Sequence, residues 1–274
     1  MNNKNKIDLH MHSNASDGLC SPGELIKIAA NAGLAAVGLT DHDTIKGLPE
    51  ASCAAKKYNL ELVPGVEIGV LEENQEVHIL GYYPQYKDDL KNALERVLKE
   101  RYTRMDEIVG KLRKQGFKLN LEEVLAEAGN SAPGRLHLAR LLLKKRYINS
   151  LEQAFSLYLN QNREAYVPRK TFTIKQAMSL LKEVKAIPVI AHPGVDGSSM
   201  LDKLIPLGLL GIEVFHPEHS TAQKRTYQKI ALENNLLITG GSDYHGDYKR
   251  YGYYPQHLAI SNQYLLPLKN YTVK

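Results

Sequence analysis

Apolar stretches that fit β-strands alternate with helix-like patterns in the N-terminal third of the chain. The expected strands lie in IDLHMH, AAVGLTDHD, ELVPGVEIGV and EVHILGYY. Helices are expected over about Pro22 to Ala32 and over a segment ending near Tyr58. The first begins with a capping box formed by Ser21 and Glu24, and it ends at Gly33, where a left-handed residue is favoured. This βαβα rhythm predicts neighbouring strands with helices outside them.

A long helical stretch then interrupts the alternation. From about Lys87 to Asn162 the pattern is nearly continuous helix, with breaks at Gly116, around Gly129 to Gly134 and near Tyr147 to Ser150. The alternation returns after Val167, with strands in IPVIAHPG, GIEVF and LLITGGSDYHG and helices over about 174–184, 201–207 and 221–233. We therefore expect one α/β domain, built from residues 1–102 and 163–274, that carries a helical insertion over 103–162.

Composition and charge are those of an ordinary globular protein. Of 274 residues, 43% are hydrophobic and 24% are charged, which argues against a disordered or a membrane protein. The N-terminal MNNKNKIDLHMHS lacks the apolar core of a secretory signal, so we expect a cytoplasmic location, with no membrane and no obligate protein partner. Only Cys20 and Cys53 are present, too few for a disulfide framework.

The distribution of charge narrows the expected ligands. Acids and bases alternate over Lys87 to Arg113, which is typical of the solvated face of a helix. The net charge of +5 is mild and favours a small anionic substrate. By itself it does not indicate a long nucleic-acid footprint.

Histidines gather at the ends of the predicted strands. Six of the ten lie there with five carboxylates: His10, His12, His42, His78, His192 and His245, with Asp17, Asp41, Asp43, Glu67 and Asp243. In a closed barrel of parallel strands, the side chains at the carboxyl ends converge on one mouth. We therefore expect these residues to share a single pocket.

The spacing within IDLHMH favours a metal site. His10 and His12 are two residues apart, so on a strand both imidazoles point to the same face. Carboxylates are needed too, because several cations can share a cavity only if anions bridge them, and Glu67 in PGVEIG is the best bridging candidate. The mixed imidazole and carboxylate set suits manganese, zinc or iron, whereas magnesium or calcium would be bound almost entirely by oxygen.

Six motifs occur in a specific order: DLHMHSNASDG, GLTDHDT, PGVEIG, VHILGY, AHPG and GSDYHG. This order, from about Ile7 to Gly246, resembles the PHP (polymerase and histidinol phosphatase) phosphoesterases. The resemblance is closer to the free-standing group that includes nucleoside 3',5'-bisphosphate phosphatases and 5'-to-3' exoribonucleases. It implies a distorted (β/α)7 barrel with a small helical insertion, and two or three divalent metal ions at one mouth.

The resemblance also implies how the ligands are shared among the ions. The first ion would be bound by His10, His12, Glu67 and Asp243. Glu67 would bridge to a second ion bound by His78 and His192. A third ion would be bound by Asp17, His42 and His245. All nine expected ligands are present, which argues against an inactive copy.

Other residues are expected to contact the substrate. The segment PGRLHLAR resembles a Gly-Arg-Pro-His segment of the family, whose arginine reaches a substrate phosphate, and Arg135 would be that residue. Leu136 stands where the relatives have proline. His219 matches a histidine of the relatives, whereas His216 stands where they often have an aromatic residue; both are candidate contacts, and Lys170 is another. Arg135 and His219 are expected to neutralise charge on the phosphate during catalysis.

These expectations define a hydrolase of phosphoric ester bonds. We expect hydrolysis of a phosphate monoester of a nucleotide, foremost a nucleoside 3',5'-bisphosphate, by a hydroxide that bridges two metals. The alternatives are a 5'-to-3' exoribonuclease acting on short RNA, a phosphatase of the histidinol-phosphate type, and a non-catalytic metal-binding module. The module would be marked by lost ligands or a fused polymerase region, and the sequence shows neither.

Overall fold

The computed structural model describes residues 5–73, 75–85, 88–129, 132–168, 171–194, 197–246 and 258–271. The chain divides into two compact units. The barrel unit comprises Met1–Lys91 and Phe172–Lys274, and the helical unit comprises Asn92–Thr171. The helical unit therefore begins earlier and ends later than the insertion expected over 103–162.

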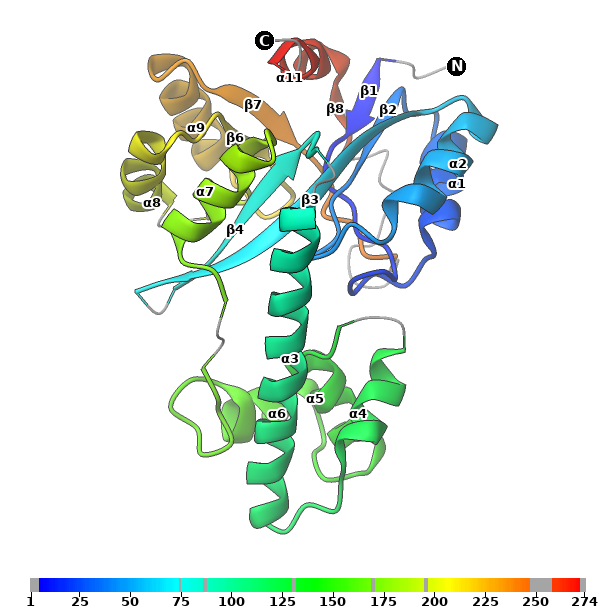
Figure 1. Ribbon diagram of the computed structural model, residues 1–274, viewed down its shortest axis with the longest axis vertical. Coiled ribbons are helices and arrows are strands. Elements are labelled where there is room, and N and C mark those ends of the chain that lie inside the picture. The colour runs from blue at the N-terminus through cyan, green and yellow to red at the C-terminus, as the bar shows by residue number, and fades with distance from the viewer. Residues whose placement is uncertain are drawn as a thin grey trace. The chain divides into compact units, whose positions relative to one another are not determined.

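Eight strands of the described chain form one mixed sheet in the barrel unit (Figure 1). They are β1 (Lys6–Asp8), β2 (Ala36–Leu39), β3 (Glu61–Glu72), β4 (Gln75–Tyr82), β5 (Ile187–Ile190), β6 (Gly211–Phe215), β7 (Leu237–Gly240) and β8 (Ile260–Ser261). The order is β7-β6-β5-β4-β3-β2-β1-β8. The Leu9 N–H donates to the Gly240 carbonyl (3.2 Å), and Met11 pairs with Tyr244, so the continuations of β1 and β7 meet. The result is a nearly closed barrel, which confirms the predicted α/β fold.

Helices of the barrel unit lie outside this sheet (Figure 1). They are α1 (Pro22–Asn31), α2 (Leu48–Tyr58), α7 (Ile174–Glu183), α8 (Gly197–Leu204), α9 (Thr221–Glu233) and α11 (Leu265–Tyr271), with short 3-10 turns at Ile205–Leu207 and Asn262–Tyr264. The predicted start of α1 is confirmed: the Glu24 N–H donates to Ser21 Oγ (3.2 Å), and the Ser21 N–H donates to Glu24 Oε2 (2.8 Å). Gly33 follows α1 with φ of 76°, as predicted.

Strand β4 departs from the expected parallel arrangement, because it runs antiparallel to both β3 and β5. It follows β3 through a tight hairpin, in which Glu72 pairs with Gln75 and Glu73 has φ of 48°. The parallel neighbours β1, β2 and β3 end at one mouth of the barrel. Since β4 runs the other way, its N-terminal half reaches this mouth, and there His78 pairs with Gly69.

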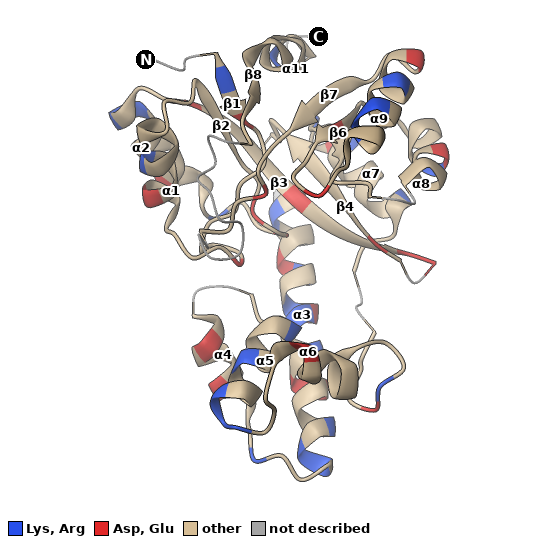
Figure 2. Ribbon diagram, turned by 180° about the vertical axis from the view of Figure 1, so that it is seen from behind, with Lys and Arg blue, Asp and Glu red and all other residues tan. Residues whose placement is uncertain are grey.

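The helical unit has its own apolar core. Its elements are α3 (Asp88–Lys114), whose first turn belongs to the barrel unit, α4 (Leu121–Ala128), α5 (Arg135–Lys144), α6 (Leu151–Ala154) and a π-helical turn at Phe155–Leu159. Acidic and basic residues alternate along the α3 ribbon (Figure 2), while Ile108 and Leu112 are buried with Leu138 and Leu142. Among the helices that the structure describes, none is long and apolar enough to span a bilayer.

Candidate metal centre

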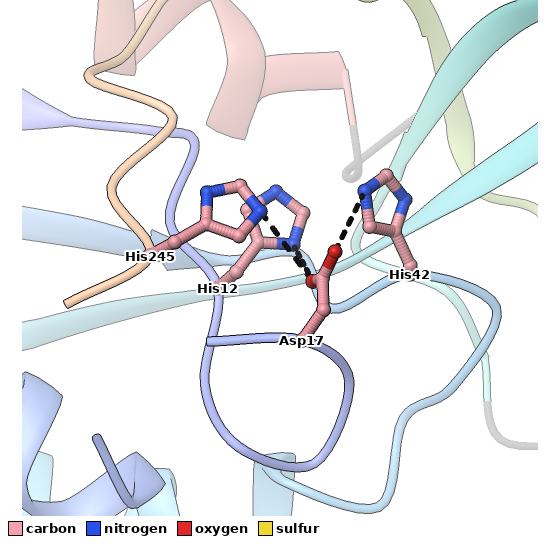
Figure 3. A group of neighbouring side chains, drawn as sticks. All are labelled: His12, Asp17, His42 and His245. Carbon is pink, nitrogen blue, oxygen red and sulfur yellow. Dashed lines mark ion pairs between the residues drawn. The ribbon is translucent and has the colours of Figure 1, made fainter. Parts of the chain in front are cut away.

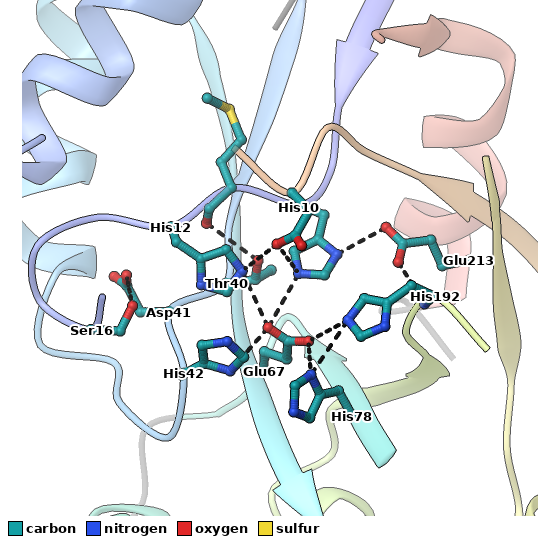
Figure 4. A network of polar contacts seen from close by, with 12 residues as sticks. His10, His12, Ser16, Thr40, Asp41, His42, Glu67, His78, His192 and Glu213 are labelled. Carbon is teal, nitrogen blue, oxygen red and sulfur yellow. Dashed lines mark hydrogen bonds and ion pairs between the residues drawn. The ribbon is translucent and has the colours of Figure 1, made fainter. Parts of the chain in front are cut away.

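Glu67, fully buried in β3, is the common neighbour of five imidazoles (Figure 4). Its Oε2 lies 3.2 Å from His10 Nε2, 3.2 Å from His12 Nε2 and 3.1 Å from His42 Nδ1. Its Oε1 lies 2.9 Å from His78 Nδ1 and 3.1 Å from His192 Nε2. The two oxygens of one carboxylate therefore face two different groups of histidines.

Asp243 adds a second carboxylate to the first of these groups. Its Oδ1 lies 3.1 Å from His12 Nε2 and 3.5 Å from His10 Nε2. The continuation of β7 approaches β1 closely here, because a Cβ at Gly241 would lie only 2.5 Å from His10 Cβ. The Asp243 N–H then donates to the His10 carbonyl (2.9 Å), which fixes the backbone that carries the carboxylate.

Asp17 gathers a third group on the other side of His12 (Figure 3). Its carboxylate lies 3.4 Å from His245 Nε2 and 3.8 Å from both His42 Nε2 and His12 Nδ1. Asp41 shapes the loop that presents Asp17, since it accepts hydrogen bonds from the backbone and hydroxyl of Ser13 and from the Ser16 hydroxyl.

Asp41 and Asp43 were expected in the shared pocket, but their carboxylates accept hydrogen bonds from neighbouring loops and strands. Both oxygens of Asp41 accept from the serine loop at 2.7 to 2.8 Å. Asp43, with φ of 50°, accepts from the Gly69 N–H on β3 (3.1 Å). These two side chains stabilise the loops around the candidate ligands.

Glu213 on β6 is a site residue that the sequence analysis missed. It is fully buried, and its Oε1 lies 2.9 Å from His10 Nδ1 while its Oε2 accepts from the His192 N–H (2.8 Å). Since Glu213 is the partner of His10 Nδ1, the Nε2 atom is the one that faces Glu67 and Asp243 and that could bind a metal ion. His192 has φ of 24°, a rare backbone conformation that this hydrogen bond helps to hold. The signal in the sequence was a glutamate within the apolar strand GIEVF.

The electrostatics of the cluster keep its carboxylates ionised. Burial opposes the charged form of Glu67, but His42, His10 and His78 outweigh it and hold the pKa of Glu67 well below its usual value. The same balance lowers the pKa of Asp17 and of Asp243. Burial disfavours the charged form of His12 as well, yet Asp243 and Glu67 raise the pKa of that ring to about 10.

The donors fit divalent cations. Each of three groups brings its ligand atoms within 4.8 Å of one another: His12, Asp17, His42 and His245; His10, His12 and Glu67; and His42, Glu67 and His78. Ligand atoms that bind one ion at about 2.1 Å lie roughly 3 to 4 Å from one another. The separations between the carboxylate oxygens and imidazole nitrogens given above are of this size. Both ring nitrogens of His12 and Nδ1 of His42 are buried and have no partner in hydrogen-bond geometry among the described residues. A cation would satisfy such nitrogens.

The predicted substrate contacts lie in different parts of the chain. In the barrel unit, His219 donates from Nδ1 to the Val214 carbonyl (2.9 Å), and its Nε2 accepts from the Gly194 N–H (3.4 Å). In the helical unit, the Arg135 guanidinium lies 6.0 Å from the ring centres of both Phe155 and Tyr166. Lys170 lies outside the described residues.

Comparison with known proteins identifies the family. The model of the PHP domain matches residues 8–171, more than half of the chain. The chain belongs to the PHP family. This assignment confirms the resemblance to the PHP family. The matched residues extend from the end of β1 to the end of the helical unit.

Several PHP relatives have similar lengths and named activities. A Haemophilus influenzae 5'-3' exoribonuclease is 33% identical over 88% of this chain and 90% of its own. An Eggerthella lenta phosphoribosyl 1,2-cyclic phosphate 1,2-diphosphodiesterase is 29% identical over 89% of this chain and 95% of its own. A Chromobacterium violaceum 3',5'-nucleoside bisphosphate phosphatase is 30% identical over 87% of each chain. A Bifidobacterium adolescentis protein described as a metal-dependent phosphoesterase has a similar structure, with a TM-score of 0.84, 27% identity and coverage of 97% and 96%.

Proposed function

We propose that this chain hydrolyses a phosphate monoester of a nucleotide with the help of bound divalent metal ions. The predicted enzyme class, a hydrolase of phosphoester bonds, is confirmed by the PHP assignment and by the activities of the relatives. The observation that carries the proposal is the position of Glu67, whose two oxygens face separate groups of imidazoles. A carboxylate in that position is suited to join two cations.

The ligand assignment follows these groups. The first ion is assigned to His10, His12, Glu67 and Asp243, the second to Glu67, His78 and His192, and the third to Asp17, His42 and His245. Support comes from the distances of 2.9 to 3.8 Å between the donors of each set. Manganese, zinc or iron suits this mixture of imidazole and carboxylate.

When bound, such ions supply Lewis-acid activation of the phosphate ester and of water. The chain's own residues set the geometry in which this happens. Glu213 holds the His10 ring and the His192 backbone, so that both imidazoles present their Nε2 atoms. Asp41 holds the serine loop that carries Asp17. The three lowered carboxylate pKa values keep the anionic ligands charged at neutral pH.

Arg135 and His219 are assigned to the substrate phosphate. Among the described residues Arg135 donates one hydrogen bond, from Nη1 to the Leu159 carbonyl (3.2 Å), and its other N–H groups suit a phosphate. Burial lowers the pKa of His219, whose Nε2 accepts a backbone hydrogen bond in the free protein. A bound phosphate dianion favours protonation of an imidazole, so Nε2 of His219 would become a donor when substrate arrives.

Replacing Glu213 with glutamine is expected to lower metal affinity or turnover by about 10- to 100-fold, as is typical when a partner of a metal-binding histidine is changed. The glutamine has nearly the same volume, but it presents an N–H group to one of the two donors that Glu213 now accepts from. Metal titration and phosphate release would both be measured. Glu233→Gln, an exposed change on α9, is the control. Equal behaviour of the two variants would contradict the role of Glu213.

The substrate is tested by a phosphate-release screen with manganese, zinc and iron. The panel contains a nucleoside 3',5'-bisphosphate, the matching 3'- and 5'-monophosphates, short 5'-phosphorylated RNA and histidinol phosphate. We expect the bisphosphate to have the highest kcat/KM, and the same proposal places the enzyme in the cytoplasm, where nucleotides are abundant. Preference for RNA would favour the second candidate, an exoribonuclease, which the 33% identity to the Haemophilus influenzae enzyme supports. No turnover of any phosphate ester would refute the proposal.

A further inference from the structure

His216 is a buried histidine next to the cluster, and neither the ligand assignment nor the assigned phosphate contacts include it. It follows β6 directly, and only 4% of its surface is exposed. Its ring centre lies 5.1 Å from that of His192 and 6.5 Å from that of His10. A buried imidazole in this position needs a partner for each nitrogen, because an unsatisfied polar atom is costly in the interior.

The partners of His216 fix its tautomer. The Glu218 N–H donates to His216 Nδ1 (3.3 Å) within the turn Phe215-His216-Pro217-Glu218. A neutral ring that accepts at Nδ1 carries its proton on Nε2. Nε2 is buried, and among the described residues it has no partner within hydrogen-bond distance, but Asp243 Oδ2 faces it at 3.6 Å. His216 therefore presents a donor, not a lone pair, to Asp243.

The two oxygens of Asp243 have separate neighbours. Oδ1 faces His12 Nε2 and His10 Nε2 at 3.1 and 3.5 Å, on the side of the candidate ions. Oδ2 is the oxygen that faces His216 Nε2, at 3.6 Å. The Asp243 backbone is fixed by its hydrogen bond to His10, so the remaining freedom is rotation of the carboxylate. A donor at Oδ2 removes that freedom.

We propose that His216 is a positioning residue that donates from Nε2 to Asp243 Oδ2 and thereby aims Oδ1 at the first metal ion. The inference rests on the proposed function, because it takes Asp243 to be a ligand. It differs from the two expected roles of His216, a substrate contact or a replacement for an aromatic side chain. The present separation of 3.6 Å is a few tenths of an ångström longer than a hydrogen bond, and contacts of this kind are often long before a ligand binds.

Three substitutions separate these roles. His216→Gln places an amide N–H near the position of Nε2, so the donor to Asp243 is kept. His216→Asn places its amide near Nδ1 instead, so that donor is lost in a residue of similar polarity. His216→Phe keeps a buried ring and removes both nitrogens.

Binding of Co²⁺ to metal-free protein is followed by visible absorption and calorimetry, and kcat and KM are measured separately with saturating Mn²⁺. We expect the Co²⁺ dissociation constant to rise by about 10- to 100-fold in His216→Phe and His216→Asn, and to stay within about threefold in His216→Gln. Thermal unfolding of the metal-free variants shows that each is folded. If His216→Phe does not fold, the asparagine and glutamine pair still decides the question.

Three outcomes would overturn the inference. Wild-type Co²⁺ affinity in both His216→Phe and His216→Asn would show that no donor to Asp243 is needed. Unchanged affinity with a raised KM would make His216 a substrate contact. Equal loss of affinity in all three variants would make the imidazole itself a ligand. If the wild-type chain binds no Co²⁺, the proposed function itself fails, which is a separate result.

Discussion

Replacing Glu67 with glutamine is expected to reduce phosphate release by about 1000-fold or more, beyond the roughly 10- to 100-fold typical of a residue that only supports a ligand. Glu67 contacts His10, His12 and His42 through one oxygen and His78 and His192 through the other. The neutral amide of glutamine cannot neutralise the charge of two cations. Its N–H group would also face the imidazole nitrogens that are assigned to the metal ions. Phosphate release and bound metal per chain, measured by mass spectrometry, should both fall.

The size of the replaced side chain is preserved, so the fold of the variant should persist. Glu72→Gln is a matched control, because it makes the same chemical change at the end of the same strand, where Glu72 pairs with Gln75 in the hairpin. We expect the control to keep wild-type metal content and turnover. Full metal content together with full activity in Glu67→Gln would remove the bridging carboxylate from the mechanism.

Local patterns predicted much of the centre. The two-residue spacing of His10 and His12 on an extended segment placed both rings on one face, and the structure brings both within 3.2 Å of Glu67. The capping box at Ser21 likewise depends only on residues three apart. Such features can be predicted because short-range geometry determines them.

The direction of β4 could not be obtained by the same reasoning. The alternating rhythm suggested another parallel strand, but the two-residue connection after Glu72 permits only a hairpin. His78 therefore reaches the mouth from the N-terminal half of its strand. The prediction placed His78 beside the other histidines, but it did not include the reversed direction of its strand. Strand direction depends on the turn before β4, which apolar periodicity does not describe.

Glu213 and Asp8 show a second limit, because each has a partner that is more than 200 residues away in the sequence, His10 for Glu213 and Ser242 for Asp8. Burial raises the pKa of Asp8 to about 6, and its Oδ1 accepts from the backbone of His10 and of Ser242, joining the continuations of β1 and β7. A glutamate or aspartate within an apolar strand is unusual. Which histidine it supports becomes clear only when β6, β7 and β1 are placed side by side.

Removing metal from the wild-type protein is expected to abolish phosphate release and to lower the thermal unfolding temperature. An ion at 1000 times its dissociation constant stabilises a folded protein by about 4 kcal/mol. One kcal/mol corresponds to roughly 2–4 °C in a domain of this size, so a shift of about 10 °C is expected. Chelator would be dialysed away before phosphate release and circular dichroism are measured, and manganese would then be added back.

The stabilisation has a structural origin that a comparison of variants can isolate. Several imidazole nitrogens of the cluster are buried and have no partner in hydrogen-bond geometry within the described part of the chain, so a cation satisfies them only in the folded barrel. Glu67→Gln should therefore lose most of the manganese-dependent shift, whereas Glu72→Gln should keep it. A chelated wild-type protein that still hydrolyses its substrate at the full rate would contradict metal dependence. A shift equal in both variants would place the stabilising ion away from Glu67.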